Sequence, residues 1–179
     1  MELCLRDKII AVAGGAGATG TAICEVLENE GAVPIIIDLD KGRNFTINSD
    51  LTDYVACEKA VGILIKNFGR IDGVVNCVSS YDLLLLEALP WLKKSGGAIV
   101  NITDLPAGSR GAASEAIYGG LIKGWAKELE GTGIRINAIL AFPGADIAHT
   151  VAFILAGRGG LAHGELIHVE AIPEDSQFD

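Results

Sequence analysis

Short apolar runs alternate along the chain with longer segments whose apolar residues recur about every three to four positions. The apolar runs predict strands near Lys8–Ala13, Val33–Asp38, Asn44–Ile47, Gly73–Val78, Ala98–Thr103, Arg135–Ala141 and Glu165–Val169. The helical spacing fits Thr19–Glu30, Asp53–Phe68, Leu83–Lys94, Ala112–Glu130 and Asp146–Ala156. This alternation predicts an α/β fold in which parallel strands are joined by right-handed crossovers.

The chain has the length of one domain, at 179 residues. No linker, repeat or low-complexity stretch divides it, so we expect a single domain over residues 1–172. Residues 173–179 are polar and acidic and are expected to form a C-terminal tail. Half of the residues are hydrophobic but few are aromatic, which suits a parallel sheet covered on both faces.

The formal charge of −9 argues against nucleic-acid binding, because an acidic chain repels phosphates. The longest apolar stretch, Leu83–Leu92, is interrupted by Glu87 and Pro90, so no membrane span is expected. The N-terminus runs directly into a glycine motif and is interpreted as a first strand, not as a leader. Four cysteines (Cys4, Cys24, Cys57 and Cys77) fit no metal-binding spacing. We therefore expect no metal and a reducing, cytoplasmic location.

A glycine-rich turn follows the first predicted strand. Gly15, Gly17 and Gly20 match G-x-G-x-x-G, and Gly14 precedes them. Such glycines allow the turn and let the backbone approach a pyrophosphate, while the amides of the following helix face the anion. The position between a strand and a helix makes the motif specific. We expect the loop residues Gly14, Gly15, Gly17, Ala18, Thr19 and Gly20 to contact a dinucleotide.

The second predicted strand ends at Asp38, 18 residues after Gly20. A carboxylate there can accept hydrogen bonds from the adenosine ribose and would repel a 2′-phosphate. The sequence therefore predicts NAD as the cofactor, with NADP less favoured, although Lys41 and Arg43 lie close by. Leu39 is expected to contact the same nucleotide.

Taken together, the motifs resemble those of the short-chain dehydrogenase/reductase family along almost the whole chain. The matching segments are Ala13-Gly14 with Gly20, Asp50–Asp53, Asp72–Ser79, Gly97–Ile102, Ala126–Leu129, Gly133–Ala138, Pro143-Gly144, Asp146–Ala148 and Gly164–Val169. Ala18 stands at the middle glycine of the family's loop, and only Asn76 remains of the family's N-N-A-G in Asp72–Ser79. The resemblance implies a Rossmann-type, doubly wound sheet of about seven strands in the order 3-2-1-4-5-6-7, with helices on both faces. It also implies adenine recognition by Asp50 and Leu51, and cofactor contacts from Asn76, Cys77, Val78, Pro143 and Gly144.

The family's catalytic set does not match. The family uses a serine after the fifth strand, a tyrosine as acid/base, and a lysine four residues later that lowers the tyrosine pKa. In this chain the serine position falls on Thr103 or Asp104, the tyrosine position on Gly111 and the lysine position on Glu115. A glutamate would raise the pKa of a neighbouring hydroxyl, and glycine offers no proton.

An alternative set would use Tyr118, which lies 14 residues after Asp104, together with Lys123. Lys123 is five residues beyond Tyr118, about 140° around a helix, and Ile122 holds the i+4 position. This alignment also needs a deletion within the helix. The simpler interpretation of Tyr118 is a packing residue.

Two segments of the family pattern also look deleted: one between Ser79 and Gly97, and the substrate-covering lobe after Pro143-Gly144. The first functional hypothesis is therefore a degenerate member, or pseudoenzyme, that binds NAD(H) as a regulatory or structural subunit. We expect it to form homo- or hetero-oligomers through helix 112–130 and strand 164–169. The second hypothesis is an active oxidoreductase that transfers hydride between NAD(H) and a carbonyl or alcohol. A third is a binding module without nucleotide, which retention of the glycine loop disfavours.

Overall fold

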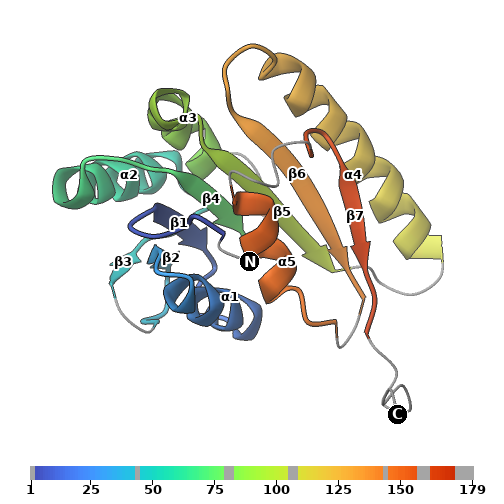
Figure 1. Ribbon diagram of the computed structural model, residues 1–179, viewed down its shortest axis with the longest axis horizontal. Coiled ribbons are helices and arrows are strands. Elements are labelled where there is room, and N and C mark those ends of the chain that lie inside the picture. Colours follow the sequence, from blue (N-terminus) through green and yellow to red (C-terminus); the bar gives the residue numbers. More distant parts are fainter. Residues whose placement is uncertain are drawn as a thin grey trace.

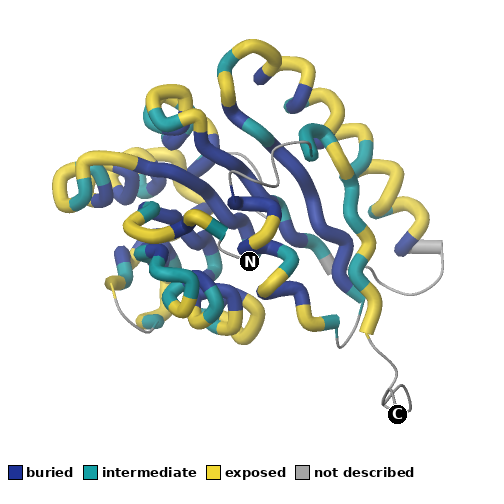
Figure 2. Tube along the Cα trace, in the orientation of Figure 1, coloured by how far each residue is buried: buried dark blue, intermediate teal, exposed yellow. Residues whose placement is uncertain are grey.

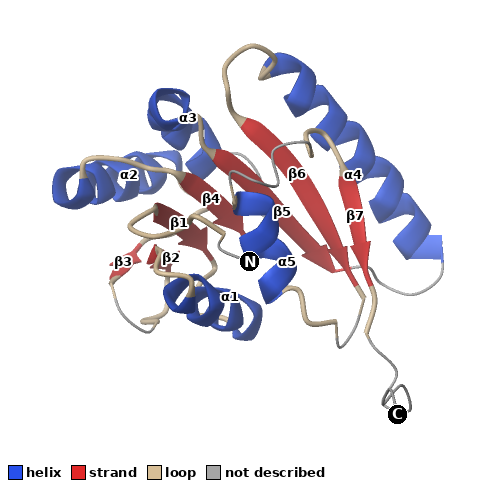
Figure 3. Cartoon of the chain, viewed as in Figure 1, coloured by secondary structure: helices blue, strands red, loops and turns tan. Residues whose placement is uncertain are grey.

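The computed structural model describes residues 3–42, 45–78, 83–104, 109–142, 145–156 and 162–171. Within these residues, strands and helices alternate along most of the chain (Figures 1 and 3). The strands are β1 (Ile9–Ala13), β2 (Val33–Asp38), β3 (Thr46–Asn48), β4 (Gly73–Asn76), β5 (Ala98–Asp104), β6 (Arg135–Ala141) and β7 (Leu166–Val169). The helices are α1 (Ala18–Asn29), α2 (Tyr54–Phe68), α3 (Leu83–Ser95), α4 (Ser109–Glu128) and α5 (Ala148–Leu155).

The seven strands form one sheet in the order β3-β2-β1-β4-β5-β6-β7, and every neighbouring pair is parallel. This confirms the predicted doubly wound α/β fold and its strand order. β1 lies between β2 and β4. The chain adds β2 and β3 on one side of β1 and then returns to add β4 to β7 on the other side, so the direction of strand addition reverses next to β1. In such sheets, ligands bind in the crevice at the carboxyl ends of the strands, where the order reverses.

Helices cover both faces of the sheet, and alternate side chains of each strand serve the two layers. Ile10 and Val12 of β1 belong to the core cluster beneath α1 and α5. Ile9 and Ala11 belong to the opposite cluster, beneath α2, α3 and α4. Figure 2 shows the strands as a buried band between these layers. The strands are covered on both faces, which explains why they stand in the sequence as continuous apolar runs.

The starts of α2 and α5 lie one and two residues later than predicted, and at each an aspartate before the helix accepts a hydrogen bond from an amide of the first turn. Asp53, predicted as the first residue of α2, instead precedes the helix and accepts a hydrogen bond from the Ala56 N–H. Gly69 ends α2 in the left-handed region, at φ 74°. Asp146 likewise precedes α5 and accepts a 3.2 Å hydrogen bond from the Ala148 N–H. Both carboxylates satisfy amides that a helix start leaves unpaired.

The connection between β2 and β3 is unusually short. The two strands are parallel neighbours, yet only residues 39–45 separate them. Parallel neighbours generally need a crossover of a dozen or more residues, commonly a helix. The direct connection shifts β3 to Thr46–Asn48 from the predicted Asn44–Ile47.

Two buried polar side chains fasten distant parts of the sheet. Asp72 directly precedes β4, and its side chain is 4% exposed. It accepts hydrogen bonds from the Ile9 N–H and from the side chains of Lys8 and Arg70. Asn137, fully buried in β6, donates to the Ala162 carbonyl oxygen and accepts from the Glu165 N–H. Asn137 thus holds the segment that leads into β7.

Among the described residues, no helix is both long and apolar enough to cross a membrane.

Candidate functional site

Residues 14–17 join β1 to α1 at the carboxyl edge of the sheet, and the fold requires two glycines of this loop and one in the first turn of α1. Gly14 adopts φ 73°, which disfavours other residues. A Cβ on Gly15 would lie 2.9 Å from the Ile36 side chain. A Cβ on Gly20 would lie 2.5 Å from the Gly15 Cα and would clash with the Gly14 carbonyl oxygen. The close packing of α1 against the loop therefore explains these glycines without a ligand.

Gly17 has no such packing reason. It is exposed, has φ −69°, and a Cβ there would only make an ordinary 3.5 Å contact with the Gly14 carbonyl oxygen. Gly17 directly precedes α1 and caps it with no side-chain hydrogen bond, and Ala18 and Thr19 in the first turn are exposed. The amides of a helix start lack intrahelical partners. This arrangement leaves open backbone that an anion can approach closely.

Asp38 lies beside this loop at the end of β2. Its Oδ2 atom accepts a 3.1 Å hydrogen bond from the Ala16 N–H, and its Oδ1 atom accepts one from the Asp40 N–H at 3.1 Å. The side chain is half-buried. The carboxylate is therefore held against the glycine loop, at the place where a ribose adjoining a bound pyrophosphate would lie.

A surface pocket of about 250 Å³ opens next to Asp38. It is lined by Gly14, Asp38, Leu39, Ser49, Asp50, Leu51, Thr52 and Val78. Leu39 is 62% exposed and forms an apolar wall beside the two carboxylates. Exposed apolar surface next to polar edge groups is the lining expected for a flat heteroaromatic ring.

Asp50 stands at the rim of this pocket and is held in place by its neighbour. Its Oδ1 atom accepts hydrogen bonds from the Thr52 N–H at 2.9 Å and the Thr52 hydroxyl at 2.7 Å. These bonds lower the pKa of Asp50 below its ordinary value, so the group is ionised at neutral pH. Leu51, the next residue, is buried. Asp50 and Leu51 thus both line this pocket, and their role in adenine recognition stays a prediction.

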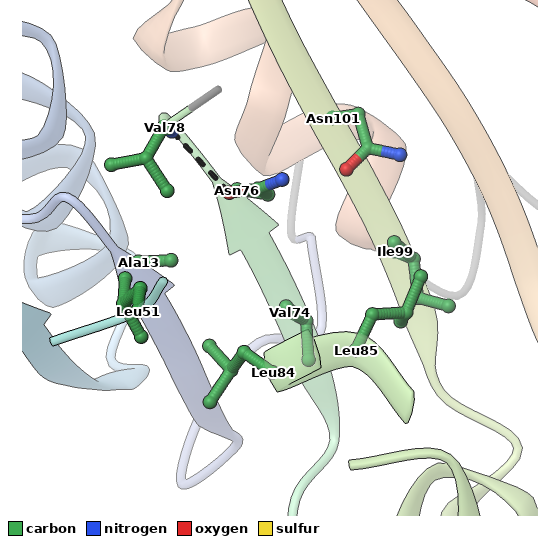
Figure 4. Close-up of a pocket in the computed structure, with 9 residues that line it drawn as sticks. All are labelled: Ala13, Leu51, Val74, Asn76, Val78, Leu84, Leu85, Ile99 and Asn101. Atoms are coloured by element: carbon green, nitrogen blue, oxygen red, sulfur yellow. Dashed lines mark hydrogen bonds between the residues drawn. The ribbon is translucent and has the colours of Figure 1, made fainter. Parts of the chain in front are cut away.

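Asn76, Cys77 and Val78 continue the site across the end of β4. The Asn76 Oδ1 atom accepts a 3.3 Å hydrogen bond from the Val78 N–H (Figure 4). The Cys77 N–H donates to the Ala13 carbonyl oxygen at 3.0 Å, which extends the contact between β1 and β4. A Cβ on Gly14 would lie 2.6 Å from the Val78 Cγ1 atom. The Val78 side chain therefore fills the space directly over Gly14.

Behind Val78 lies a small enclosed cavity of about 10 Å³, room for about one water molecule. It is lined by Ala13, Leu51, Val74, Asn76, Val78, Leu84, Leu85, Ile99 and Asn101. Figure 4 shows Leu84 and Leu85 of α3 beside Val74 of β4 and Ile99 of β5. Leu51 and Val78 border both this cavity and the open pocket. The cavity is a packing space and is too small to hold a nucleotide.

The positions that the resemblance assigns to tyrosine and lysine lie in the first half of α4. Gly111 is buried, and the Glu115 carboxylate lies 3.2 Å from the Nε2 atom of His168 in β7. The family pattern placed no role on His168, so the sequence analysis missed this pair. Thr103 is half-buried, and Asp104 pairs with Ala141 in the sheet.

Tyr118, the alternative acid/base, is half-buried on the side of α4 that also carries the buried Ile122. Burial raises the pKa of the Tyr118 phenol above its ordinary value. A tyrosine that exchanges protons at neutral pH needs the opposite shift. Lys123 is exposed, one residue beyond the i+4 position. This arrangement is that of a packing tyrosine.

The remaining predicted contacts, Pro143 and Gly144, lie outside the described residues, as does the tail 173–179. The connections at this edge of the sheet are nevertheless defined in length. Residues 77–82 join β4 to α3, 105–108 join β5 to α4, and 142–147 join β6 to α5. No more than six residues are thus available in any of these connections to cover a bound molecule.

No protein-family model matches the chain. A trans-4-hydroxycyclohexanecarboxylate dehydrogenase from Sinomonas cyclohexanicum is 25% identical over 221 aligned positions, covering 95% of this chain and 84% of that protein. A 3-oxoacyl-(acyl-carrier-protein) reductase from Thermotoga maritima is 27% identical over 180 positions, covering 75% of this chain and 73% of that protein. Both relatives are oxidoreductases by name.

The first of these alignments is longer than the chain itself. It includes 95% of 179 residues, about 170, in 221 positions, so about 50 positions of the dehydrogenase stand opposite gaps in this chain. Such gaps agree with the expectation that internal segments are missing.

The structural similarity extends over the whole sheet. A 3-ketoacyl-(acyl-carrier-protein) reductase from Brucella melitensis, solved in complex with NADH, superposes with a TM-score of 0.82. The match covers 93% of this chain and 98% of the reductase, at 18% sequence identity. At this identity the similarity establishes a common fold.

Proposed function

Because the chain is a member of the short-chain dehydrogenase/reductase family, we propose that it binds NAD(H) but acts as a non-catalytic regulatory or structural subunit. The single observation that supports binding most strongly is Gly17. It is a glycine that the fold does not need, placed where its backbone is open toward the edge of the sheet. A dinucleotide supplies the reason, because any side chain there would keep the pyrophosphate away from the helix amides.

Asp38 supports NAD as the preferred dinucleotide. Its carboxylate points to the glycine loop and borders the pocket that suits an adenine ring. A ribose 2′-hydroxyl can donate to this carboxylate, whereas a 2′-phosphate would be repelled. The Brucella melitensis reductase of similar fold was solved with NADH, and the preference of this chain for NAD over NADP is argued from its own residues.

The loss of catalysis is proposed from the residues that replace the family's set. Gly111 offers no hydroxyl, and Glu115 brings a negative charge where the resemblance implies a lysine. Tyr118 does not compensate, because burial raises its pKa and Lys123 lies at the wrong helical spacing to lower it.

An exposed apolar face on α4 supports a role through association. It consists of Ala113, Ala116, Ile117, Gly120, Leu121 and Gly124, all exposed. Ile117 is 62% exposed and Leu121 is 41% exposed. A Cβ on Gly120 or Gly124 would meet nothing within 4 Å, so a partner helix could approach closely there. We propose that this face and the edge strand β7 contact a second copy or a related subunit.

The second candidate function is an active oxidoreductase. It is favoured by the oxidoreductase names of the relatives. Bound NAD(H) would supply the hydride transfer. The chain's own contribution would have to be a proton donor or acceptor, for which Tyr118 is the candidate.

A titration of the full chain with NADH and NADPH, followed by calorimetry, tests binding and cofactor choice together. NADH is expected to bind more tightly than NADPH and to raise the melting temperature, as mass action requires. Absence of binding by both nucleotides would refute the proposal.

A panel of carbonyl and alcohol substrates tests the loss of catalysis. We expect no turnover by the chain alone, and no difference between the wild type and Tyr118→Phe. Turnover that Tyr118→Phe abolishes would establish the active oxidoreductase instead.

For association, Ile117→Glu with Leu121→Glu is expected to shift the sedimentation of the full chain toward the monomer. If the wild type is oligomeric and the double variant sediments in the same way, this face of α4 is not the contact surface.

A further inference from the structure

The amino edge of the sheet, opposite the glycine loop, carries two adjoining surface hollows. The Arg135 hollow, of about 260 Å³, lies where β1, β5 and β6 begin and reaches the end of α5. The Trp91 hollow, of about 280 Å³, lies beside the ends of α2 and α3, and Ser95 lines both. All strands run away from this edge (Figure 1). No described residue of either hollow lines the pocket next to the glycine loop.

The charge of these hollows is opposite to that of the chain. Among the described residues that line them, four are basic and one is acidic: Lys8, Arg70, Lys94 and Arg135 against Asp72. The whole chain has 14 basic and 23 acidic residues. A hollow lined by one sign of charge raises the local concentration of ions of the other sign. Anions are therefore drawn to this edge of an otherwise acidic chain.

The one carboxylate of this edge, Asp72, is directed inward. Its Oδ2 atom accepts a hydrogen bond from the Ile9 N–H, and its Oδ1 atom accepts hydrogen bonds from Lys8 and Arg70. The Asp72 side chain is 4% exposed, whereas those of Lys8 and Arg70 are 40% and 52% exposed. An ammonium has three N–H donors and a guanidinium has five, so both cations keep donors for another anion. Asp72 thus orients two cations and offsets one of their two charges.

Arg135 brings a positive charge that no described carboxylate offsets. Its Nη1 atom donates to the Ile154 carbonyl oxygen at 2.9 Å, and its Nη2 atom donates to the carbonyl oxygens of Leu155 and Ala156 at 3.3 and 3.2 Å. These acceptors, at the end of α5, carry only partial negative charge. Within the described part of the chain, no carboxylate lies at ion-pair distance from the guanidinium. Burial lowers the pKa of Arg135 below its ordinary value, because the cation has lost part of its hydration.

We propose that the Arg135 hollow is a second binding site, which takes small phosphate-bearing anions. The phosphate group would lie between Lys8 and Arg135, since lysine and arginine are the usual donors to phosphate. The buried Leu5 and Leu155 close the bottom of the hollow and would contact the rest of a phosphate ester. Phosphate is favoured over a carboxylate because three of the four positive charges at this edge remain after Asp72 is counted. The site does not depend on the proposed nucleotide function, because it lies at the opposite edge of the sheet.

Titration of the full chain with inorganic phosphate tests this inference, at an ionic strength held constant with sodium chloride. The backbone amide resonances of Lys8, Gly97 and Ala98 report on the Arg135 hollow in nuclear magnetic resonance spectra. We expect these resonances to shift saturably, with a dissociation constant in the millimolar range or below, and with the same constant when NADH is present in excess. Phenyl phosphate distinguishes the source of the ligand: tighter binding than inorganic phosphate indicates a phosphate ester, and equal binding indicates the free ion.

Charge-removing variants locate the site. Lys8→Met and Arg135→Gln should each weaken phosphate binding by about five- to tenfold, because each removes a charged donor. Lys59→Met is the matched control: it makes the same change of charge on the exposed surface of α2 and should leave the affinity within about twofold of wild type. Urea unfolding checks that each variant is folded. If Arg135→Gln does not fold, because its bonds to α5 are lost, Lys8→Met decides the test.

The outcomes for the two sites are distinguishable. Phosphate shifts that do not saturate, or that are equal in Lys8→Met and Lys59→Met, would show an adventitious ion only and overturn the second site. Phosphate that NADH displaces would lie at the glycine loop and would also overturn it. If NADH does not bind but phosphate binds saturably beside Lys8, the nucleotide function is refuted and the second site stands.

Discussion

The Asp38 carboxylate accepts a 3.1 Å hydrogen bond from the Ala16 backbone N–H, so the end of β2 and the glycine loop are tied together before any ligand binds. The two residues are 22 positions apart in the sequence. Because Asp38 is half-buried and already oriented, a ribose hydroxyl that reaches it would meet a hydrogen-bond acceptor in place. A single side chain thus contacts the loop and borders the open pocket next to it.

Replacing Asp38 is expected to weaken NADH binding and reduce the discrimination against NADPH. Removing a hydrogen bond to a charged group corresponds to about 1.5–3 kcal/mol, or about 10- to 100-fold in affinity. Asp38→Asn keeps an acceptor for the Ala16 N–H and should affect the loop less than Asp38→Ala. Titrations of both variants with NADH and NADPH check this. Unchanged NADH affinity in Asp38→Ala would remove Asp38 from the site.

Gly17→Ala and Gly20→Ala form a matched pair. Gly17→Ala should leave the free energy of unfolding within about 1 kcal/mol of wild type, since its Cβ fits and only the helix cap changes. It should nevertheless weaken NADH binding. Gly20→Ala should destabilise the fold itself, because its Cβ would meet the loop backbone. Urea unfolding and NADH titration distinguish the two, and full binding by Gly17→Ala would contradict the pyrophosphate assignment.

Asn137→Ala should be strongly destabilising. The substitution leaves the Ala162 carbonyl oxygen and the Glu165 N–H without their partner at a fully buried side chain. We expect a loss of about 2–4 kcal/mol in the free energy of unfolding, measured in urea. Asn67→Ala is the control, because the exposed Asn67 side chain donates a hydrogen bond to the Ile63 carbonyl oxygen within the same helix, α2. A loss below about 1 kcal/mol at Asn137 would show that the segment before β7 is held by other contacts.

The buried carboxylate of Asp72 should matter more than its lysine partner. Asp72→Ala removes the acceptor of the Ile9 N–H and leaves Lys8 and Arg70 unpaired, which predicts a loss of about 2–3 kcal/mol. The Lys8 side chain is 40% exposed, so Lys8→Met should cost less than about 1 kcal/mol. Chemical unfolding of both variants measures the difference. Equal losses would indicate that the ion pair, not the backbone contact, dominates.

The raised pKa of Tyr118 predicts a loss of stability in alkali. Burial makes the folded chain hold the phenol proton more tightly than the unfolded chain does. The stabilisation is therefore complete below about pH 10 and is lost as the pH rises through the folded-state pKa. Tyr118→Phe should remove this component from stability measured between about pH 9 and 11, followed by ultraviolet titration of the phenols.

Tyr54→Phe serves as the comparison, because the pKa of Tyr54 is raised mainly by its hydrogen bond to Glu87. A Tyr118 phenol that ionises near neutral pH would revive it as an acid/base candidate.

The sequence predicted the fold more fully than the contacts within the site. Apolar runs and helical spacing are local signals, so they located the strands and helices to within a few residues, whereas the strand order and the two helix layers came from the family resemblance. The glycine loop and Asp38 were also recognisable, because their chemistry is carried by short spacings. The Glu115–His168 pair joins residues 53 positions apart, and the Asp38–Ala16 bond depends on the loop conformation. Such contacts arise only when the sheet has assembled, so no local pattern encodes them.

The direct connection between β2 and β3 agrees with the sequence analysis, which placed no helix between these two strands. Only the bounds of β3 differ, by about two residues at its start and one at its end. Local capping explains the smaller errors at α2 and α5, where Asp53 and Asp146 precede the helices they were assigned to.

The all-parallel sheet also bears on how the chain reaches its native state. None of the strand pairs is a hairpin, so each pairing closes a loop, and β1 must wait for β4, more than 50 residues later. Proteins dominated by such non-local pairings fold slowly. During synthesis, β1, β2 and β3 leave the ribosome first, while β7 arrives last and completes the far edge. A chain released before β7 has joined would expose the flank of β6, and that intermediate is the state in which aggregation competes most directly with folding.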